Sequence, residues 1–600
     1  MKAIGYRTIK WLGLFCGTAA AAGVATGVVL GADDFSSIPV GVLRFGRAAC
    51  YVGLIAVDYQ KSLHSGNVDK DSANYLQLKS EVHQRSAEKL LKLCCINGGT
   101  FVKIGQHLGS LEYLLPPEYV KTLQVLHSKA PKSDIESVKS VLRQELHADP
   151  DELFTSFSAE PVGAASLAQV HVATTQDGRK VAVKVQHRTV KEHAAIDMKG
   201  MEFLVSAVSY FFPDFNFDWL VEETKINLPL ELDFEHEGRN AEQVAEMFKQ
   251  FPWLKVPSID WTLSTKRVLT MEYCEGGQVN DPVYMKAHNL APEQVAERLG
   301  LLYSEMIFCR GYVHSDPHPG NVLVNRRPRG DAQIILLDHG LYARVSDNIR
   351  ESYSKFWLAI LGQDVDGIAK YGRELGVGDL AGLFACMVTA RSWDSITRGI
   401  DKHSINDAER NEVSNYATKL LPEIIATLGR VNRQMLLLLK TNDLLRGIEY
   451  SLNIQHSRKS FLTMSRCCVR AVYDRQMLLC SSSFCRLLTS VNLRAALLRI
   501  DVYTSYISCM TNIHKLFAWS RQSTVAEAFR WVSEVPGLRL PFAASTWLFC
   551  QAWLCVGVLK NAFVTVVFFG RQRPNYLHTS FDENGRVVFK ESRTLKDGHA

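Results

Sequence analysis

The 600-residue sequence predicts an α+β fold in which a small lobe led by a β-hairpin precedes a large helical lobe. Three observations support this prediction. Short β-type runs at 170–174 and 180–185 flank Gln176-Asp177-Gly178, which is typical of a hairpin turn. A strand is expected at 268–273, and two more at 322–325 and 334–338 enclose a polar turn. Residues 75–150, 190–250 and most of the chain from 292 onward carry apolar residues at helical spacing.

The composition limits the class of protein. Hydrophobic residues make up 47% of the chain and charged residues 22%, so a large core can form and disorder is excluded as the main state. The formal net charge of +6 is small for this length, so we expect no nucleic-acid partner. The 14 cysteines include no C-x-x-C pair, which favours free thiols in a reducing compartment over a metal or redox role.

The first 32 residues predict a targeting segment. Lys2, Arg7 and Lys10 precede any acid, and on a helix they would face away from most of the apolar side chains. This pattern is typical of a mitochondrial presequence, and a secretory signal is the alternative. Residues 11–32 carry no charge and are long enough to span a bilayer, so an anchor and a cleaved leader both stay open.

A second apolar region lies near the C-terminus. Residues 540–559 are uncharged, and after Lys560 the apolar sequence continues to Gly570. Segment 540–569 is therefore a candidate membrane-associated segment. A pair of core helices is the alternative, because Pro541 and Gln551 weaken the membrane interpretation. The polar tail that follows is expected to be disordered.

Three motifs carry the residues that phosphoryl transfer needs. Lys184 ends the strand Val181-Ala-Val-Lys184, where its ammonium can hold nucleotide phosphates. In His314-Ser-Asp316-Pro-His-Pro-Gly-Asn321, Asp316 can accept a hydroxyl proton, and Asn321 follows at the spacing of a metal-holding asparagine. Asp338 heads an Asp-x-Gly turn, as a metal-binding aspartate should. This order of motifs predicts a bilobal protein-kinase-like fold.

Two features depart from an ordinary protein kinase. The loop Gly163-Ala-Ala165-Ser-Leu-Ala168-Gln-Val170 keeps one glycine and has alanine where the glycine-rich loop has two more, so we expect a stiffer loop. His318 stands where a lysine would touch the transferred phosphate, and a neutral imidazole weakens that contact. His314, His318 and His339 suggest a metal site, but the Asp/Asn spacing favours Mg²⁺ on oxygen ligands.

These motifs, with Lys103-Ile-Gly-Gln106, Glu231-Leu-Asp233 and Leu437–Gly447, resemble the UbiB (aarF-domain) atypical kinases over residues 75–450. The resemblance implies that ATP or ADP and Mg²⁺ are bound. Lys184 would pair with Glu237, Asp316 would be the base or its remnant, and Asn321 and Asp338 would hold Mg²⁺. The expected nucleotide contacts are Gly163, Ala164, Ala165, Ser166, Ala168, Val170, Lys184, Met271, Glu272 and Tyr273.

The resemblance also implies a lid. Lys103 and Gln106 would lie on a helical extension folded over the active site, and Glu231, near Asp233, would pair with that lysine. Such a lid fills the groove where a protein substrate would lie. Family members are accordingly associated with ATPase, small-molecule or lipid roles around coenzyme Q and mitochondrial lipids. Without the resemblance, a solvated lysine and a wet acidic helix face are the alternatives.

The expected organisation has five parts. They are a targeting or membrane segment at 1–32, a helical extension at 33–150, a kinase-like N-lobe at 151–280, a C-lobe at 281–475, and a helical C-terminal region at 476–600. We expect a mitochondrial atypical kinase or ATPase associated with the inner membrane. Its partners would be nucleotide, a lipid or membrane surface, and inner-membrane proteins. A protein kinase acting on a mitochondrial protein and a nucleotide-binding scaffold are the alternatives.

A basic group lies in the C-terminal helices. It consists of Arg446, Arg458, Arg466 and Arg470. These arginines would make either a membrane-facing surface or, as we favour, a solvated helix face.

Overall fold

A computed structural model describes most of the chain between residues 37 and 522 and two short strands near its end. The described ranges are 37–63, 72–109, 115–127, 132–211, 218–315, 318–389, 391–398, 433–452, 454, 458–522, 578–581 and 587–590. The predicted segments 1–32 and 540–569 lie outside these residues. The chain divides into two compact units, one of residues 1–278 with 320–342, the other of 279–319 with 343–600.

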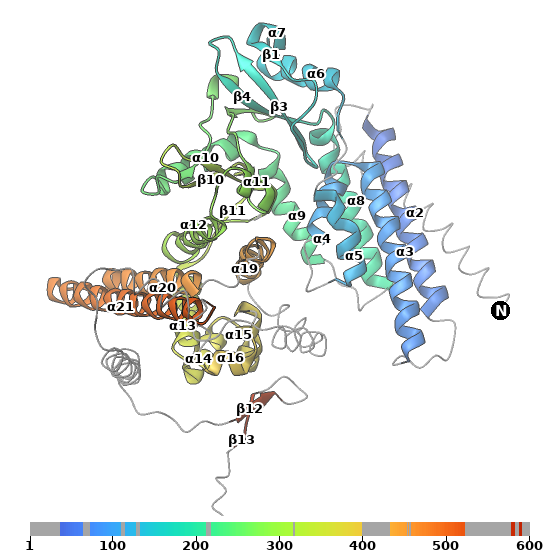
Figure 1. Ribbon diagram of the computed structural model, residues 1–600. Helices are drawn as coiled ribbons and strands as arrows, with labels where there is room; N and C mark the ends of the chain where they lie inside the picture. Colours follow the sequence, from blue (N-terminus) through green and yellow to red (C-terminus); the bar gives the residue numbers. More distant parts are fainter. Residues whose placement is uncertain are drawn as a thin grey trace, which may run out of the picture. The chain divides into compact units, whose positions relative to one another are not determined.

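The first unit begins with a helical extension. It contains α2 (Ser37–Leu63), α3 (Ala73–Asn97), α4 (Thr100–Gly109), α5 (Pro117–Leu123) and the 3₁₀ turn η1 (Gln124–His127). Figure 1 shows α2 and α3 side by side, and α2 also packs against α8 (Val190–Phe211). Phe45, Ala48 and Ala49 bury their side chains there.

Within the described residues, Val40–Leu63 of α2 is the one helix long and apolar enough to cross a membrane. Two of its charged side chains, Arg44 and Asp58, are paired with other helices of the same unit. The Arg44 guanidinium donates to Asp197 of α8 at 2.8 Å, and Arg85 of α3 donates to Asp58 at 2.9 Å. These pairs tie α2 to the extension.

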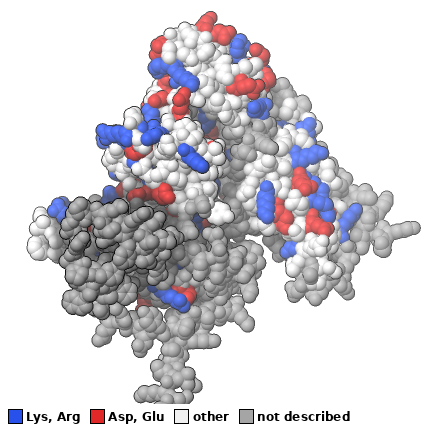
Figure 2. Space-filling view, viewed as in Figure 1, with Lys and Arg blue, Asp and Glu red and all other residues white. Residues whose placement is uncertain are grey.

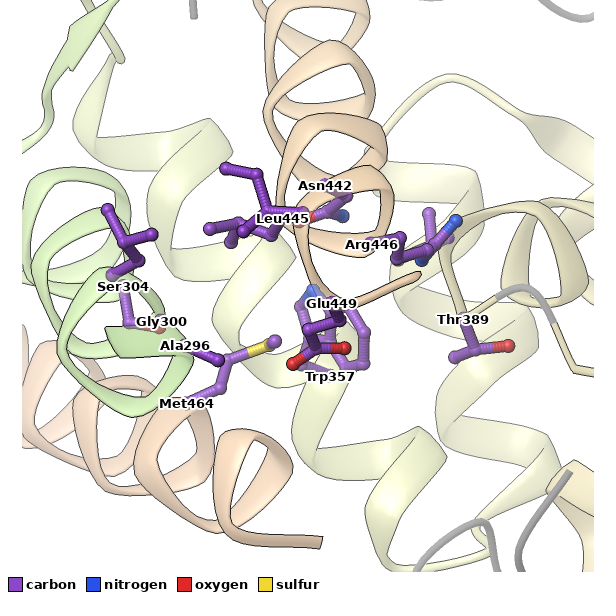
Figure 3. Close-up of a pocket in the computed structure, with 13 residues that line it drawn as sticks. Ala296, Gly300, Ser304, Trp357, Thr389, Asn442, Leu445, Arg446, Glu449 and Met464 are labelled. Carbon is purple, nitrogen blue, oxygen red and sulfur yellow. The ribbon is translucent and has the colours of Figure 1, made fainter. Parts of the chain in front are cut away.

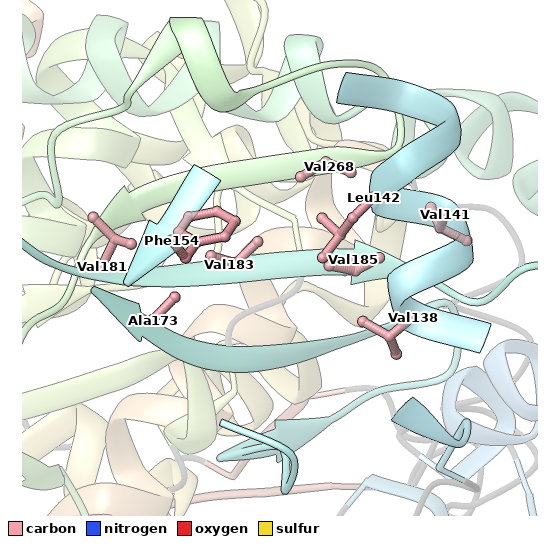
Figure 4. Packing of buried hydrophobic residues seen from close by; sticks show 9 residues of the cluster. All are labelled: Val138, Val141, Leu142, Phe154, Ala173, Val181, Val183, Val185 and Val268. Carbon is pink, nitrogen blue, oxygen red and sulfur yellow. The ribbon is translucent and has the colours of Figure 1, made fainter. Parts of the chain in front are cut away.

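An antiparallel sheet forms the N-lobe core. Its main order is β1 (Phe154–Phe157), β3 (Ala168–Thr175), β4 (Lys180–Gln186) and β6 (Val268–Glu272), with β2 (Gly163–Ala164) paired to β3. The β3–β4 hairpin is confirmed, and Gly178 takes a φ of 81° in its turn. Helix α6 (Ile135–Leu146), followed by α7 (Pro150–Leu153), covers one face with Val138, Val141 and Leu142, as Figure 4 shows.

The unit is completed by helices and a second sheet. Helices α9 (Asp218–Glu231) and α10 (Phe234–Met247) follow α8, and η2 (Trp261–Leu263) precedes β6. The second sheet has the order β5 (Leu254–Lys255), β10 (Ala332–Leu336), β9 (Val322–Arg326) and β7 (Gly277–Gln278). β5 and β10 are parallel, whereas the other pairs are antiparallel. Asp338 lies just beyond the end of β10.

The second unit is mainly helical, as predicted. Its helices are α11 (Pro282–Ala287), α12 (Pro292–Ser304), α13 (Asp347–Leu361), α14 (Val365–Glu374), α15 (Ala381–Thr389), α16 (Trp393–Arg398), α19 (Arg433–Ser451), α20 (Arg458–Leu479) and α21 (Ser483–Gln522), with short elements η3 (Glu305–Arg310, a π-helix), β8 (Tyr312–His314) and η5 (Gly378–Leu380). The boundaries between the units fall within η4 (Pro319–Asn321) and β11 (Tyr342–Arg344). Helix α20 packs against α12, α13 and α21. The fold is therefore α+β and kinase-like, with a helical extension and a helix-rich C-terminal region.

Two expectations need correction. The tail after Arg571 contains an antiparallel hairpin of β12 (His578–Phe581) and β13 (Val587–Lys590), where we expected no regular structure. Aromatic and β-branched residues flank Asn584-Gly585, a strong hairpin signal.

Two cysteines are also bonded rather than free, because the turn between α20 and α21 brings the Cα atoms of Cys480 and Cys485 to 5.6 Å.

The basic group of the C-terminal helices forms specific contacts. Arg470 forms an ion pair with buried Glu305, and Arg466 forms one with Asp501. Arg446 donates to the Met387 carbonyl oxygen at 3.2 Å. These three side chains make contacts within the second unit, while the side chains of Arg466 and Arg470 stay 46% and 41% exposed.

Charges of both signs are mixed on the face that Figure 2 shows. Figure 2 shows Lys and Arg interspersed with Asp and Glu on the visible face of the described residues. This mixture agrees with the small net charge of +6.

Candidate active site

Lys184 and Glu237 form a buried ion pair in the first unit. The Lys184 Nζ lies 2.7 Å and 2.8 Å from the two carboxylate oxygens of Glu237. The same nitrogen lies 3.8 Å from Oδ2 of Asp338 and 5.0 Å from the ring centroid of Phe234. Three segments distant in sequence thus bring one lysine and two carboxylates together.

Strand alternation and a helix cap position this pair. Val183 and Val185 of β4 point into the core beneath α6, so Lys184 between them points to the opposite face. Asp233 caps α10 by accepting from the backbone N–H groups of Glu235 and His236. The cap starts the helix so that Glu237, one turn on, faces the sheet with 3% of its surface exposed.

The three groups set one another's protonation. Burial by itself would lower the pKa of Lys184, but the Asp338 and Glu237 carboxylates raise it above its ordinary value. Burial raises the pKa of Glu237 to about 7, against the opposing effect of Lys184. Lys184 therefore keeps its positive charge at neutral pH, as a phosphate-holding lysine requires.

Asp338 and Asn321 lie next to each other at the edge of the second sheet. The Leu337 backbone N–H donates to the Asn321 carbonyl oxygen at 3.0 Å. The Gly340 N–H donates to Oδ1 of Asp338 at 2.9 Å, and the Asp338 side chain is 40% exposed. The backbone of Asn321 is thus bonded to the residue before Asp338, and a carboxylate and an amide oxygen are ligand types that suit Mg²⁺. The predicted base Asp316 lies outside the described residues.

His339 has a structural role instead of a metal-binding one. Its Nε2 lies 3.2 Å from the Leu336 carbonyl oxygen and its Nδ1 lies 3.0 Å from the Tyr342 hydroxyl. The Asn240 side-chain amide donates to the His339 carbonyl oxygen at 2.9 Å. Both ring nitrogens are engaged, so these contacts fasten the Asp-His-Gly turn to α10.

The alanine-rich loop folds without glycine conformations. Gly163 and Ala164 pair with Val170 and Gln169, and the Ala165 N–H donates to the Ala168 carbonyl oxygen at 2.8 Å. His187 Nε2 lies 3.1 Å from the Ala165 carbonyl oxygen. None of residues 163–170 has a positive φ. Alanine therefore fits the loop without strain, although its Cβ atoms restrict the loop's motion.

The expected nucleotide contacts at 271–273 are already paired with protein. Met271 pairs with Ala182 in the sheet, and the Glu272 N–H donates to the Ser258 carbonyl oxygen at 2.9 Å. The Tyr273 N–H lies 3.3 Å from the Lys180 carbonyl oxygen. Nucleotide contacts from this segment remain a prediction, and they would use groups other than these two N–H donors.

The Lys-x-Gly-Gln segment lies on α4 and reaches toward the ion pair. Lys103 Nζ lies 2.8 Å from Oε2 of Glu231, with the two side chains 22% and 12% exposed. Glu231 is close enough to Lys184 to contribute to its raised pKa. The Gln106 side-chain amide donates to the Leu126 carbonyl oxygen at 3.0 Å and thus holds α4 to η1.

A cavity outside this site was missed by the sequence analysis. Figure 3 shows it in the second unit, where Asn442, Arg446 and Glu449 of α19 face Trp357 of α13 and Met464 of α20. Asn442 donates to the Tyr353 hydroxyl at 3.0 Å. The signal that could have found it is the segment Leu437–Gly447, which supplies several lining residues.

Comparison with known proteins identifies similar chains. The family described as the ABC1 atypical kinase-like domain matches residues 125–372. AarF domain-containing protein kinase 1 of Gallus gallus is 52% identical over 491 residues, covering 82% of this chain and 94% of its own. The Mus musculus protein of the same name is 51% identical over 487 residues, covering 79% and 92%. AarF domain-containing kinase 1 of Drosophila melanogaster is 50% identical over 457 residues, covering 76% and 88%.

Solved structures are more distant. The Rv3197–erythromycin complex from Mycobacterium tuberculosis has a TM-score of 0.37 and 21% identity, covering 64% of this chain and 99% of that one. The Rio2 kinase–ADP/Mg²⁺-phosphoaspartate complex from Chaetomium thermophilum has a TM-score of 0.22 and 10% identity, covering 55% and 93%.

Proposed function

Because this chain belongs to the ABC1/AarF (UbiB-type) atypical kinase family, we propose that it binds Mg-ATP and hydrolyses it or transfers its terminal phosphoryl group. We place this activity in mitochondrial lipid homeostasis, linked to coenzyme Q, and in the organisation of the inner membrane. The mitochondrial location rests on the basic N-terminal segment and on the family resemblance.

The arrangement of Lys184, Glu237 and Asp338 carries the proposal. Lys184 would hold the phosphates, Glu237 keeps its ammonium in place, and Asp338 with Asn321 would hold Mg²⁺. When bound, Mg²⁺ supplies neutralisation of the charge that develops on the phosphate oxygens. Asp338 offers oxygen lone pairs from a half-exposed position, which is the donor chemistry that this cation takes.

The Lys103–Glu231 ion pair supports a small acceptor over a protein substrate. It fastens α4 of the extension to the end of α9, next to the groups that surround Lys184. A fastened extension leaves access for water, a lipid headgroup or another small molecule. We therefore favour an ATPase or lipid-linked activity over protein phosphorylation.

Helix α21 supports a membrane surface as a partner. Large apolar side chains recur along it at helical spacing and are exposed, namely Phe484 (75%), Leu487 (62%), Leu488, Val491, Leu498 (62%) and Val502. At about 100° per residue, Arg494 and Arg499 fall on the two margins of this stripe. An exposed apolar stripe with basic margins matches an anionic lipid surface.

ATP hydrolysis by the full chain tests the proposed activity. We expect Mg-ATP turnover that rises when vesicles of mitochondrial lipid composition are added. Asp338→Asn keeps the shape of the side chain but removes its charge, so turnover should fall at least tenfold, which corresponds to about 1.4 kcal/mol of barrier. Equal turnover by this variant would contradict the proposal.

Asp177→Asn is the matched control. Asp177 lies in the β3–β4 hairpin turn, where it pairs with Arg179 at the surface. Asparagine is common in such a turn, so this variant should hydrolyse ATP at the wild-type rate. Phosphorylation of a specific protein by the wild type but not by Asp338→Asn would support the protein-kinase alternative. Nucleotide binding without ATP turnover would support the scaffold alternative.

A further inference from the structure

Three potential metal ligands converge in the second unit, apart from the nucleotide site. They are Glu305 and Cys309 of the π-helix η3 and Cys467 of α20. One ligand atom of each lies within 4.8 Å of the other two. Cys467 Sγ is 4.0 Å from Oε1 of Glu305, and Cys309 Sγ is 3.8 Å from the Cys467 carbonyl oxygen.

Local structure explains why these side chains meet. Glu305 and Cys309 are four residues apart, so they lie on the same side of their helical segment. That segment takes the wider π geometry, which is rare and frequent at functional sites. Helix α20 packs directly on η3 and presents Cys467 to it. Cys468 points about 100° away around the helix and is not part of the trio.

Among the described residues, only one of the two Glu305 carboxylate oxygens has a hydrogen-bond partner. Glu305 is 3% exposed, and its Oε1 accepts a hydrogen bond from Nη1 of Arg470. Its Oε2 is buried and has no hydrogen-bond partner among the described residues. A buried carboxylate oxygen without a partner costs free energy, so a cation at this position would relieve the cost.

We propose that Glu305, Cys309 and Cys467 bind a thiophilic divalent cation, with Zn²⁺ as the best match. Two sulfurs and one carboxylate oxygen form a donor set typical of zinc, and they leave a fourth tetrahedral position for water. Cys309 is only partly buried, so water can reach that position. The spacing of the three atoms approaches that of ligands around a shared ion.

Charge balance supports the assignment. On binding, each thiol loses its proton to solvent, so two protons are released as two metal–sulfur bonds form. The two thiolates and the carboxylate then exceed the charge of the ion by one negative charge. The Arg470 guanidinium beside Glu305 compensates for this excess and holds the carboxylate from outside. No oxidant or reductant is needed.

The site would fasten α20 to the segment that precedes β8. Within the second unit, η3 ends at Gly311, which has a φ of 62°, and β8 follows at Tyr312–His314. The catalytic-loop sequence comes directly after this strand. A metal ion here would therefore stabilise the base of that loop, whether or not the proposed ATP chemistry is correct.

Metal binding by the full chain is the test. Protein purified with a reductant and stripped with a chelator is titrated with Zn²⁺ or Co²⁺ alone. We expect about one ion bound per chain with release of about two protons, and thiolate-to-cobalt charge-transfer absorption with Co²⁺. Absence of these bands would overturn the proposal.

Variants identify the ligands. Cys309→Ser combined with Cys467→Ser should abolish the cobalt bands, whereas Cys94→Ser, which removes an equally buried thiol of α3, should keep them. Cobalt bands that persist in the double variant would overturn the assignment. A Cys309–Cys467 disulfide that remains in protein purified with the reductant would also overturn it. Asp338→Asn should bind Co²⁺ normally, so failure of the ATPase and failure of the metal site are distinguishable.

Discussion

The central residue of this protein is Lys184, because its charge is set by groups from three separate segments. Its position on β4 follows from strand alternation, with valines toward the core on either side. Its partner Glu237 is as fully buried, and breaking one side of a buried pair costs about 3–5 kcal/mol since the other charge stays behind. This pair therefore contributes both to the stability of the N-lobe and to the orientation of the ammonium.

Glu237 predicts opposite pH trends for activity and stability. Its pKa is raised to about 7 from an ordinary value of 4.5, so the folded state binds this proton more tightly than the unfolded state. As pH falls from 8 toward 5, protonation at Glu237 favours the folded state, but it removes the charge that orients Lys184. We expect ATP turnover to decline below about pH 7 while this group's contribution to the free energy of unfolding rises.

Glu237→Gln should remove the decline of ATP turnover below about pH 7. It should also lower ATP turnover at least tenfold at pH 8. Glu235→Gln is the control, because Glu235 lies on the same helix but pairs with Arg239 at the surface. That control should change stability by no more than about 0.5 kcal/mol and keep the wild-type pH profile. A wild-type profile in Glu237→Gln would show that another group titrates.

At the scale of elements, a glycine decides how closely the extension packs. A Cβ on Gly105 of α4 would lie 2.4 Å from Cδ1 of Leu126 and 3.0 Å from Sγ of Cys94. Both neighbours are buried, so they have little room to move. The glycine of Lys-x-Gly-Gln thus permits close packing of α4, the helix that carries Lys103, against α3 and η1.

Gly105→Ala should destabilise the protein by about 1–3 kcal/mol, although alanine is the better helix former. Gly46→Ala is the matched control, because Gly46 also lies inside a helix, α2, and its Cβ would meet nothing within 4 Å. That change should stabilise by about 0.5–1 kcal/mol. Thermal unfolding of the two variants should give melting temperatures on opposite sides of wild type, and equal shifts would contradict the packing argument.

At the scale of the whole molecule, the chain assigns different tasks to its two units. The first contains Lys184, Glu237, Asp338 and the extension. The second contains the helical region that ends in α21, whose exposed apolar stripe would remain costly in water unless a partner covers it. The proposed contact with lipid thus belongs to the second unit.

Leu487→Glu combined with Leu498→Glu should reduce co-sedimentation of the full chain with anionic vesicles several-fold. Two carboxylates in the stripe oppose both burial in lipid and attraction to its charge. Val283→Glu is the control, because Val283 of α11 is 77% exposed but lies outside the stripe. Unchanged vesicle binding in the double variant would exclude this surface.

Residue patterns predicted five of the strands and the helical regions around them, whereas β1, β2, β5, β7, β8 and β11–β13 were not expected. The β3–β4 hairpin, β6, β9 and β10 lie where residue patterns predict them, because turns and strand alternation depend on near neighbours. The spacing of a loop motif is likewise local. The expected fold class is confirmed for these reasons.

Which distant groups meet follows from the packing of the folded chain. It places Lys103 against Glu231, makes Asp233 a helix cap, engages both nitrogens of His339 and turns Arg470 toward Glu305. It also joins Cys467 to Glu305 and Cys309, for which no motif exists. Such contacts depend on how helices pack, and packing follows from the burial of many side chains at once, which no short pattern in the sequence encodes.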